Sequence, residues 1–516
     1  MNTNLHKAIL PSMINYLNNE DNIAYIYKYE DLMNITANIN KIFFVSNFEI
    51  PIKIGDIRYG ITHVIYGYNF NMKLNEGVLP ESVELLYFIS SKYEYILQNV
   101  LPKNLKTLIL SSHSYYENDL KPGYIPEGIK YLSFGYYFNK KLNIGDLPES
   151  LECLIFGSCF NKDIRVLPKK LKTLIFGSDY DKKIEKDVLP EGLKRIDFGT
   201  SFNQSIDIGV IPESVDILKF SGKFNQPLMG VFPKNLKKLY LGGSFKQPIE
   251  KDMLPHSITE LTLYASNNQI LEKGMLPSSL TKLTIHNFNN NTIPLDAYPN
   301  KLTNLHVFLK LNSNEDLKIN LFPNTLTHLH IDGDVKQTIK PGHIPHSVID
   351  LNFNVTYHCQ SFNSNIEDNS LPDGLINLDL GDSFFENINI DSYHKLVKIN
   401  IPYNNGFIKN KNLIIVHNKI SKNNLYNIYH INDIKYVIEN ERPLIIKSIQ
   451  NMYMRINNER FLEIIISNIH KHANIMKQLK MRELQRLLAI VVFNPKRLQT
   501  ICDVYDVDFT DLVSIY

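Results

Sequence analysis

The stretch LPESLECLIFGSCFNKDI, from Leu147 to Ile164, decides the fold because the chain repeats it. It returns as LPKKLKTLIFGSDYDKKI from Leu167 and as LPEGLKRIDFGTSFNQSI from Leu189. The proline of the phrase recurs at intervals of 20 to 24 residues, with a last interval of 27. The prolines are Pro80, Pro102, Pro126, Pro148, Pro168, Pro190, Pro212, Pro233, Pro255, Pro277, Pro299, Pro323, Pro345 and Pro372. This regularity indicates a repeat array, whose core grows by the addition of similar units.

Each unit reads LPxxLxxLxFGxxFNxxI, and positions below are counted from its proline as zero. Apolar residues recur at +6 and +8, which is the period of a strand. A single strand cannot bury its apolar face alone, but stacked coils can. The pattern therefore predicts a repeat solenoid of parallel β coils of about 22 residues, with about seventeen units from residue 36 to residue 402.

Three recurring residues are expected to build each coil. Gly at +9 should end the strand with a backbone angle that other residues reach poorly. Phe at +12 should stack as an aromatic wall of the core, and Asn at +13 should bond backbone groups and form a ladder from coil to coil. The aromatic column is Phe48, Phe70, Phe138, Phe160, Phe202, Phe224 and Phe245, and the asparagine column is Asn139, Asn161, Asn203 and Asn225.

These units closely resemble the FNIP repeat, a leucine-rich-repeat-like coil found in amoebae and in the giant viruses that infect them. The resemblance rests on the LPxxLxxLxFGxxFNxxI phrase and extends over the predicted solenoid, residues 36–402. It implies a parallel solenoid used for protein binding. The family has no assigned catalytic residues.

The +7 column is the candidate partner-binding surface of the solenoid. If +6 and +8 point inward, +5 and +7 point out of the sheet, and the early +7 residues are mostly apolar. An exposed apolar run usually marks an interface. The alternatives are that β-branched residues simply favour strands or that N-terminal helices cover the run. The candidate residues on this outer sheet face are Phe43, Ile65, Tyr87, Ile109, Ile155 and Ile175.

The N-terminal segment, residues 1–35, is expected to be a helical cap. Its apolar residues recur every four positions along one face, and it resembles an F-box. In that family this face docks on the adaptor Skp1 of a cullin ubiquitin ligase. The residues that match and would bind Skp1 are Leu5, Ile9, Met13, Leu17 and Ile23.

The F-box pattern is incomplete, because His6 replaces a proline and Pro11 falls inside the expected helix. A functional F-box, a degenerate box that only caps the solenoid, and unrelated helices are the three open explanations. Beyond the repeats, residues 403–516 carry helical spacing and predict a compact C-terminal helical domain.

Several classes of function are not supported by the sequence. The net charge of +2 gives no field that would recruit nucleic acid or an anionic membrane, and no P-loop, nucleophile elbow or HExxH motif is present. We therefore expect no enzyme and no cofactor. His306, His328 and His330 form a polar column without a carboxylate or cysteine at matching positions, so no metal site is expected.

The compartment is expected to be intracellular, and the host cytoplasm if the protein is viral. The four cysteines are scattered without a CxxC pair, and neither a signal peptide nor a membrane-spanning run is found. The leading interpretation is a non-enzymatic protein-binding solenoid that serves as a substrate receptor of a Skp1-cullin-F-box ligase. The alternative is a structural scaffold with helical caps and no link to ubiquitin.

Overall fold

The structure is a computed structural model of the 516-residue chain. It describes residues 22–45, 51–67, 74–89, 100–110, 120–264, 270–289, 292–309, 317–333, 337–353 and 362–381. Shorter described stretches follow at 384, 393, 395–396, 398–401 and 414–417. All structural statements below concern these residues.

The described strands belong to one 19-stranded sheet. They are β1 (Ile23–Ile26), β2 (Lys41–Phe44), β3 (His63–Tyr66), β4 (Leu85–Phe88), β5 (Thr107–Ile109), β6 (Tyr131–Ser133), β7 (Cys153–Ile155), β8 (Thr173–Ile175), β9 (Arg195–Phe198), β10 (Ile217–Phe220), β11 (Lys238–Tyr240), β12 (Glu260–Tyr264), β13 (Lys282–Phe288), β14 (Asn304–Leu309), β15 (His328–Gly333), β16 (Asp350–Asn352), β17 (Asn377–Asp379), β18 (Lys398–Ile401) and β19 (Ile414–His417). The helical segments are α2 (Tyr29–Met33) and the 3-10 turn η1 (Leu295–Ala297).

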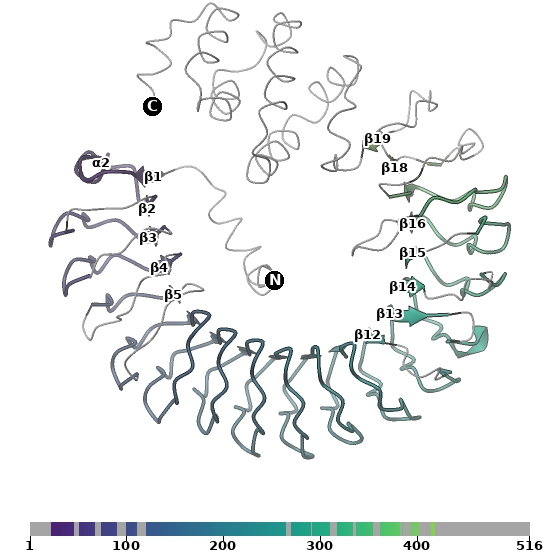
Figure 1. The fold of residues 1–516 in the computed structure, drawn as a ribbon, viewed down its shortest axis with the longest axis horizontal. Helices are drawn as coiled ribbons and strands as arrows, with labels where there is room; N and C mark the ends of the chain where they lie inside the picture. The colour runs from purple at the N-terminus through teal and green to yellow at the C-terminus, as the bar shows by residue number, and fades with distance from the viewer. Residues whose placement is uncertain are drawn as a thin grey trace, which may run out of the picture. The chain divides into compact units, whose positions relative to one another are not determined.

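Each strand from β1 to β17 pairs in parallel with the next strand along the chain. One coil therefore contributes one strand, and the strands of successive coils lie side by side along the inner side of the curved stack (Figure 1). The predicted solenoid of parallel β coils is confirmed.

The +6 and +8 side chains face the core, as predicted. Leu132, Leu154 and Leu174 pair in register across β6, β7 and β8, and each is at most 1% exposed. Phe156, at +8 of the middle coil, is also 1% exposed. Because the register repeats without a shift through these coils, each leucine covers the next and the core is continuous along the stack.

The aromatic wall is present and contains two columns rather than one. Phe156 at +8 stacks on Phe160 at +12 of the same coil, with ring centroids 3.9 Å apart. Phe160 stacks in turn on Tyr180 of the next coil at 6.0 Å. The described members of the +12 column, Phe138, Phe160, Phe202, Phe224 and Phe245, are all buried. Phe48 and Phe70 lie outside the described residues.

The asparagine ladder is confirmed in the central coils. The side-chain oxygen of Asn139 accepts a hydrogen bond from the backbone N–H of Asn161 at 3.0 Å, and Asn203 accepts from Asn225 at 2.8 Å. Asp181 replaces asparagine in one coil and makes the same bond to the N–H of Asn203 at 2.9 Å. Each rung satisfies a backbone donor that the turn would otherwise leave unpaired.

The reason for glycine at +9 differs from the prediction. Gly157, Gly177 and Gly199 do not have positive φ angles. A Cβ atom on Gly177 would instead lie 1.8 Å from the carbonyl oxygen of Gly157 in the preceding coil, and one on Gly199 would lie 1.6 Å from that of Gly177. Glycine is needed here because adjacent backbones approach too closely for any side chain.

Residues with positive φ occupy another column, three positions before the proline, which the sequence analysis missed. Gly145 has φ 84°, and Asp187 and Asn320 have φ 67° and 56° in the equivalent places. Gly, Asn and Asp are the residues that adopt this left-handed conformation most readily. The recurring (Gly/Asp/Asn)-x-x-Pro spacing in the sequence is therefore a turn signal, in addition to the strand signal.

Both ends of the solenoid differ from the expected boundaries. Residues 23–26, expected to lie in a helical cap, form β1, which pairs with β2 and buries Ile26. The edge of β2 offers backbone partners, so the IAYI segment, with its β-branched and aromatic residues, extends the sheet. At the other end, β19 lies beyond residue 402, and the contacts divide the chain into Met1–Val416 and His417–Tyr516. The rest of the predicted helical domain, 403–516, lies outside the described residues.

Candidate functional site

The candidate site is the sheet face, defined here as the +5 and +7 side chains that point away from the core. The +7 positions form a line in register across the strands, and Tyr25 of β1 is its first member because it pairs with Phe43. The apolar ladder is the N-terminal part of this line, interrupted by Ser133. Its members are Tyr25, Phe43, Ile65, Tyr87, Ile109, Ile155 and Ile175.

The exposure of the apolar ladder only partly matches the prediction. Phe43, Tyr87, Ile109 and Ile155 are half-buried. Ile65 is 3% and Ile175 1% exposed, so these two candidates are too enclosed to contact a partner directly. Ile65 lies between two aromatic neighbours in register, Phe43 and Tyr87, and larger side chains on both sides enclose it.

The strand that was expected to be helical adds exposed aromatic surface to this face. Tyr25 is 51% exposed, and its ring contacts that of Phe43 edge to face, with centroids 5.7 Å apart. Sequence reasoning missed Tyr25 because it assigned residues 1–35 to helices. The β-branched and aromatic residues of IAYI, which favour strands, were the signal that could have placed it on a strand.

A charged group follows the apolar ladder along the sheet face. Lys219 Nζ lies 3.0 Å from Asp197 Oδ2, and Arg195 Nη2 lies 3.9 Å from the same oxygen. Burial raises the pKa of Asp197 above its ordinary value, and Lys219 and Arg195 oppose this shift. Desolvation of the carboxylate therefore outweighs its two cationic neighbours.

Cys153 lies on the sheet face at +5 but is buried, with 6% of its surface exposed. Burial raises the pKa of its thiol to about 12, against an opposing contribution from Arg195. A thiol with that pKa carries almost no thiolate at neutral pH and is a poor nucleophile. Cys153 and Cys159 are both free thiols, and Cys359 and Cys502 lie outside the described residues.

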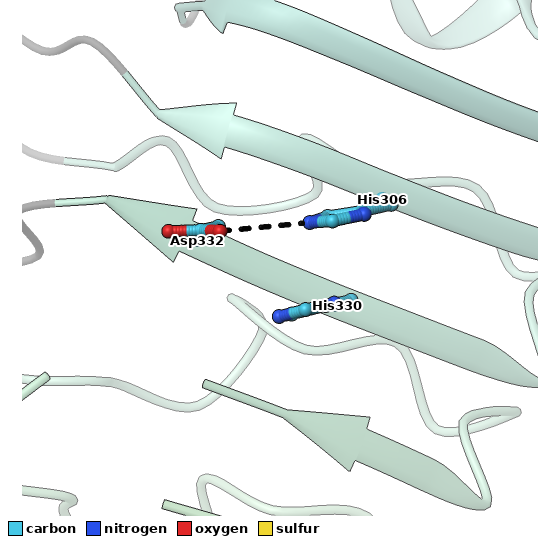
Figure 2. Close-up of side chains that lie close together, drawn as sticks. All are labelled: His306, His330 and Asp332. Carbon is cyan, nitrogen blue, oxygen red and sulfur yellow. Dashed lines mark ion pairs between the residues drawn. The ribbon is translucent and has the colours of Figure 1, made fainter. Parts of the chain in front are cut away.

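The far part of the sheet face carries a cluster of His306, His330 and Asp332. His306 of β14 pairs in register with His330 of β15, and their rings stack with centroids 3.8 Å apart. Asp332 lies two residues beyond His330 on the same strand, and its Oδ2 is 3.9 Å from His306 Nε2 (Figure 2). The ligand atoms of the three residues all lie within 4.8 Å of one another.

Asp332 is the residue that the sequence analysis missed in this cluster. The glycine pattern predicts that each strand ends at +9, but β15 continues through Asp332 at +9 to Gly333, and Asp332 shares a face with His330 two residues earlier. His328, the third histidine considered, is exposed and its Nδ1 lies 2.9 Å from Thr327 Oγ1. It does not belong to the cluster.

Aromatic rings line the side of the cluster that faces β12 and β13. His286 stacks between Tyr264 at 4.0 Å and Phe308 at 3.9 Å, and Phe308 also contacts the ring of His306. Burial lowers the pKa of His286 to about 4, with a further contribution from His306. His286 is therefore neutral at physiological pH and adds no charge to this part of the face.

The candidate Skp1-binding residues fall into two groups. Leu5, Ile9, Met13 and Leu17 lie outside the described residues. Ile23 lies in β1, paired with Lys41, and so does not occupy the helix that the F-box resemblance assigns to it.

Outside the sheet face, a second set of apolar residues is strongly exposed. They lie in the return segments, four positions before the proline or its equivalent, and were not predicted. They are Ile54, Ile144, Ile208, Met229 and Ile319. Ile144 is 79% and Ile208 72% exposed, well above the half-buried members of the apolar ladder. In the part of the chain that the structure describes, no helix is long and apolar enough to cross a membrane.

Comparison with known proteins identifies the same repeat. The family model described as FNIP Repeat matches residues 48–91, 94–137, 116–159, 138–179, 180–223, 224–266, 267–306 and 314–355. CroV588, described as a novel circular LRR protein and coming from a giant virus, is 30% identical with a TM-score of 0.57. The match covers 76% of this chain and 61% of CroV588, so the chain spans less than two thirds of that relative.

A more distant solved structure, YopM from Yersinia enterocolitica WA-314, is 19% identical with a TM-score of 0.40. That match covers 78% of this chain and 87% of YopM. No curated protein matches the chain significantly.

Proposed function

Because the chain belongs to the FNIP-repeat family, a solenoid of leucine-rich-repeat type, we propose that it binds a protein partner on the sheet face of its coils. Solenoids of this type are typical non-enzymatic interaction scaffolds, since stacked coils present an extended surface. In this proposal the chain supplies recognition and no chemistry.

The observation that carries the proposal is the apolar ladder. From Tyr25 of β1 to Ile155 of β7 there are six strand spacings, which span about 29 Å at 4.8 Å each. Four members, Phe43, Tyr87, Ile109 and Ile155, are half-buried, so each still presents surface to solvent. Aromatic and aliphatic anchors surrounded by polar groups are the usual composition of an interface centre.

The charged and polar positions that follow would form the rim of such an interface. Asp197 of β9 and Lys219 of β10 form an ion pair. Two threonines, Thr262 of β12 and Thr284 of β13, occupy the same +7 column. We expect these positions to set orientation and association rate rather than most of the affinity. The partner should therefore carry a complementary apolar surface with some polar groups at one end.

The test replaces two ladder residues together, in the variant Ile109→Glu with Ile155→Glu. Both side chains are half-buried and point away from the core, so the glutamates can reach solvent and the fold should persist. The matched control is Ile144→Glu with Ile208→Glu, which adds the same charges to exposed return segments. Tagged wild-type chain and both variants are used to isolate partners, which are identified by mass spectrometry.

We expect a defined partner to be retained by the wild type and the control and lost with the ladder variant. Equal capture by all three chains, with circular dichroism showing that all are folded, would refute the proposal. A structural scaffold that uses no sheet-face partner predicts that outcome. Unfolding of the ladder variant alone would show that Ile109 and Ile155 belong to the core.

The narrower role of substrate receptor in a Skp1-cullin-F-box ligase is part of the same proposal. It is supported by the spacing of Leu5, Ile9, Met13 and Leu17 in the sequence. The strand at Ile23 counts against a complete box, because the fifth matching residue is in the sheet. Skp1 that co-purifies with the wild type and is lost with Leu17→Asp supports the role, and absence of Skp1 from the wild-type sample refutes it.

A further inference from the structure

We propose that His306, His330 and Asp332 form a binding site for a divalent transition metal of the zinc class on the sheet face. The site goes beyond partner recognition by the apolar ladder and does not depend on it. Its residues come from two adjacent strands, β14 and β15, with two ligands on one strand and one on the other (Figure 2).

The donor types fit this class of metal. Two imidazoles and one carboxylate, with no thiolate, are the ligands that zinc and neighbouring first-row dications take in proteins. Calcium and magnesium prefer all-oxygen sites, so two ring nitrogens disfavour them. Three protein ligands would leave a fourth position of tetrahedral zinc for water.

The burial of the groups favours a bound cation. Asp332 is 1% exposed, and His306 Nε2 is buried without a hydrogen-bond partner. The distance between them, 3.9 Å, is longer than a hydrogen bond. A buried carboxylate is stabilised by a nearby cation, and a dication bound beside Asp332 would also give the His306 ring nitrogen a partner.

The distances require only a small adjustment. Ligand atoms bonded to tetrahedral zinc at about 2.0 to 2.2 Å lie about 3.4 Å apart. The separation of 3.9 Å and the upper limit of 4.8 Å within the cluster are longer by about 0.5 to 1.4 Å, which rotation of three side chains can provide. The two rings are nearly parallel, with planes 8° apart, so they must tilt for their lone pairs to converge.

The surroundings hold the ligands in place. The backbone register of β14 and β15 runs without a shift from Asn304 to Leu309, so His306 and His330 start from fixed neighbouring positions. Phe308, in register with Asp332, packs against the ring of His306 with centroids 4.3 Å apart and limits its rotation on that side. Ligand side chains that are already held in place lose less conformational entropy when the metal binds, and this raises the affinity of the site.

The test titrates the full chain, first freed of metal with a chelator, with Zn²⁺ in the presence of a competing chromophoric chelator. Co²⁺ in place of Zn²⁺ reports the ligand set through its visible absorption. The variants are Asp332→Asn, His330→Ala and His306→Phe, the last of which preserves a ring in the stack. The matched control is His328→Ala, which removes an exposed histidine of β15 that lies outside the cluster.

We expect the three cluster variants to lose one bound Zn²⁺ per chain, with affinity at that site falling by more than about 100-fold, beyond what loss of a supporting residue causes. His328→Ala should bind as the wild type does. Circular dichroism and the thermal midpoint of the metal-free variants establish that they are folded.

The proposal is overturned if the folded wild type binds no Zn²⁺ with defined stoichiometry, or if Asp332→Asn and His306→Phe both bind as the wild type does. It is also overturned if His328→Ala causes the same loss as the cluster variants. Zinc bound elsewhere in the chain does not affect the conclusion, because the test compares the amount of Zn²⁺ bound by the wild type with the amount bound by each variant.

Discussion

The replacement Gly177→Ala tests how closely the coils approach one another. The Cβ of alanine would lie 1.8 Å from the carbonyl oxygen of Gly157 and 2.4 Å from its carbonyl carbon, and both are backbone atoms. Ordinary contact for a Cβ begins at 3.4 Å, so the two coils would have to separate locally by about 1.6 Å. No side-chain rotation can relieve this overlap.

The expected cost follows from the hydrogen bonds that bracket this contact. Phe156 N–H donates to the Ile175 carbonyl at 2.9 Å, and Asp179 N–H donates to the Ser158 carbonyl at 2.8 Å. A separation of about 1.6 Å breaks both, at about 1 kcal/mol each, and overpacking adds about 1 to 3 kcal/mol. Gly177→Ala should therefore lower the free energy of unfolding by about 3 to 5 kcal/mol.

The matched control is Gly192→Ala in the next coil. Its nearest neighbour to a new Cβ is the Lys169 carbonyl oxygen at 3.8 Å, and its φ is not positive. We expect a change of no more than about 1 kcal/mol, with stabilisation as the favoured sign, because alanine reduces the entropy of the unfolded chain. Urea unfolding followed by circular dichroism measures both variants. Equal stability of the two would refute the reasoning.

Two further predictions concern the central coils. Asn203→Ala removes the acceptor of the Asn225 N–H and should cost about 1 to 3 kcal/mol in the free energy of unfolding, whereas the exposed neighbour Ser205→Ala should cost little. An equal effect of the two in urea unfolding would exclude a stabilising ladder. Asp197→Asn tests the raised pKa of that carboxyl: its stabilising contribution is present below the ordinary aspartate pKa and is lost as pH rises through the raised value. As pH rises from the ordinary aspartate pKa through the raised value, the wild type should therefore lose stability relative to Asp197→Asn. A difference in unfolding free energy that does not change with pH would contradict the raised pKa.

The features that could be predicted from the sequence are those that recur in every coil. Leu154 and Phe156 were placed in the core, and Asn161 in the ladder, because each has equivalents in coil after coil. Each position of the coil occurs many times in the sequence, so its preferred residue type and the strand period can be distinguished from chance.

The features that could not be predicted depend on contacts between coils or on single positions. Glycine can be required either for a positive φ or for close approach of another backbone. The sequence alone did not show that Gly177 is required for the close approach. Asp332 has no recurring equivalent, and its role depends on the added length of β15. The burial of Ile175 is set by neighbouring coils and is not visible in the alternation of its own strand.

The most direct measurement of the central claim, that the sheet face is the binding surface, is site-specific photo-crosslinking. A benzophenone amino acid replaces either Tyr87, half-buried on the sheet face, or Tyr59, 76% exposed in the turn before β3. Each chain is irradiated with the partner that the wild type retains. The account predicts a covalent adduct from position 87 and none from position 59. An adduct from position 59 alone, or equal adducts from both, would contradict it.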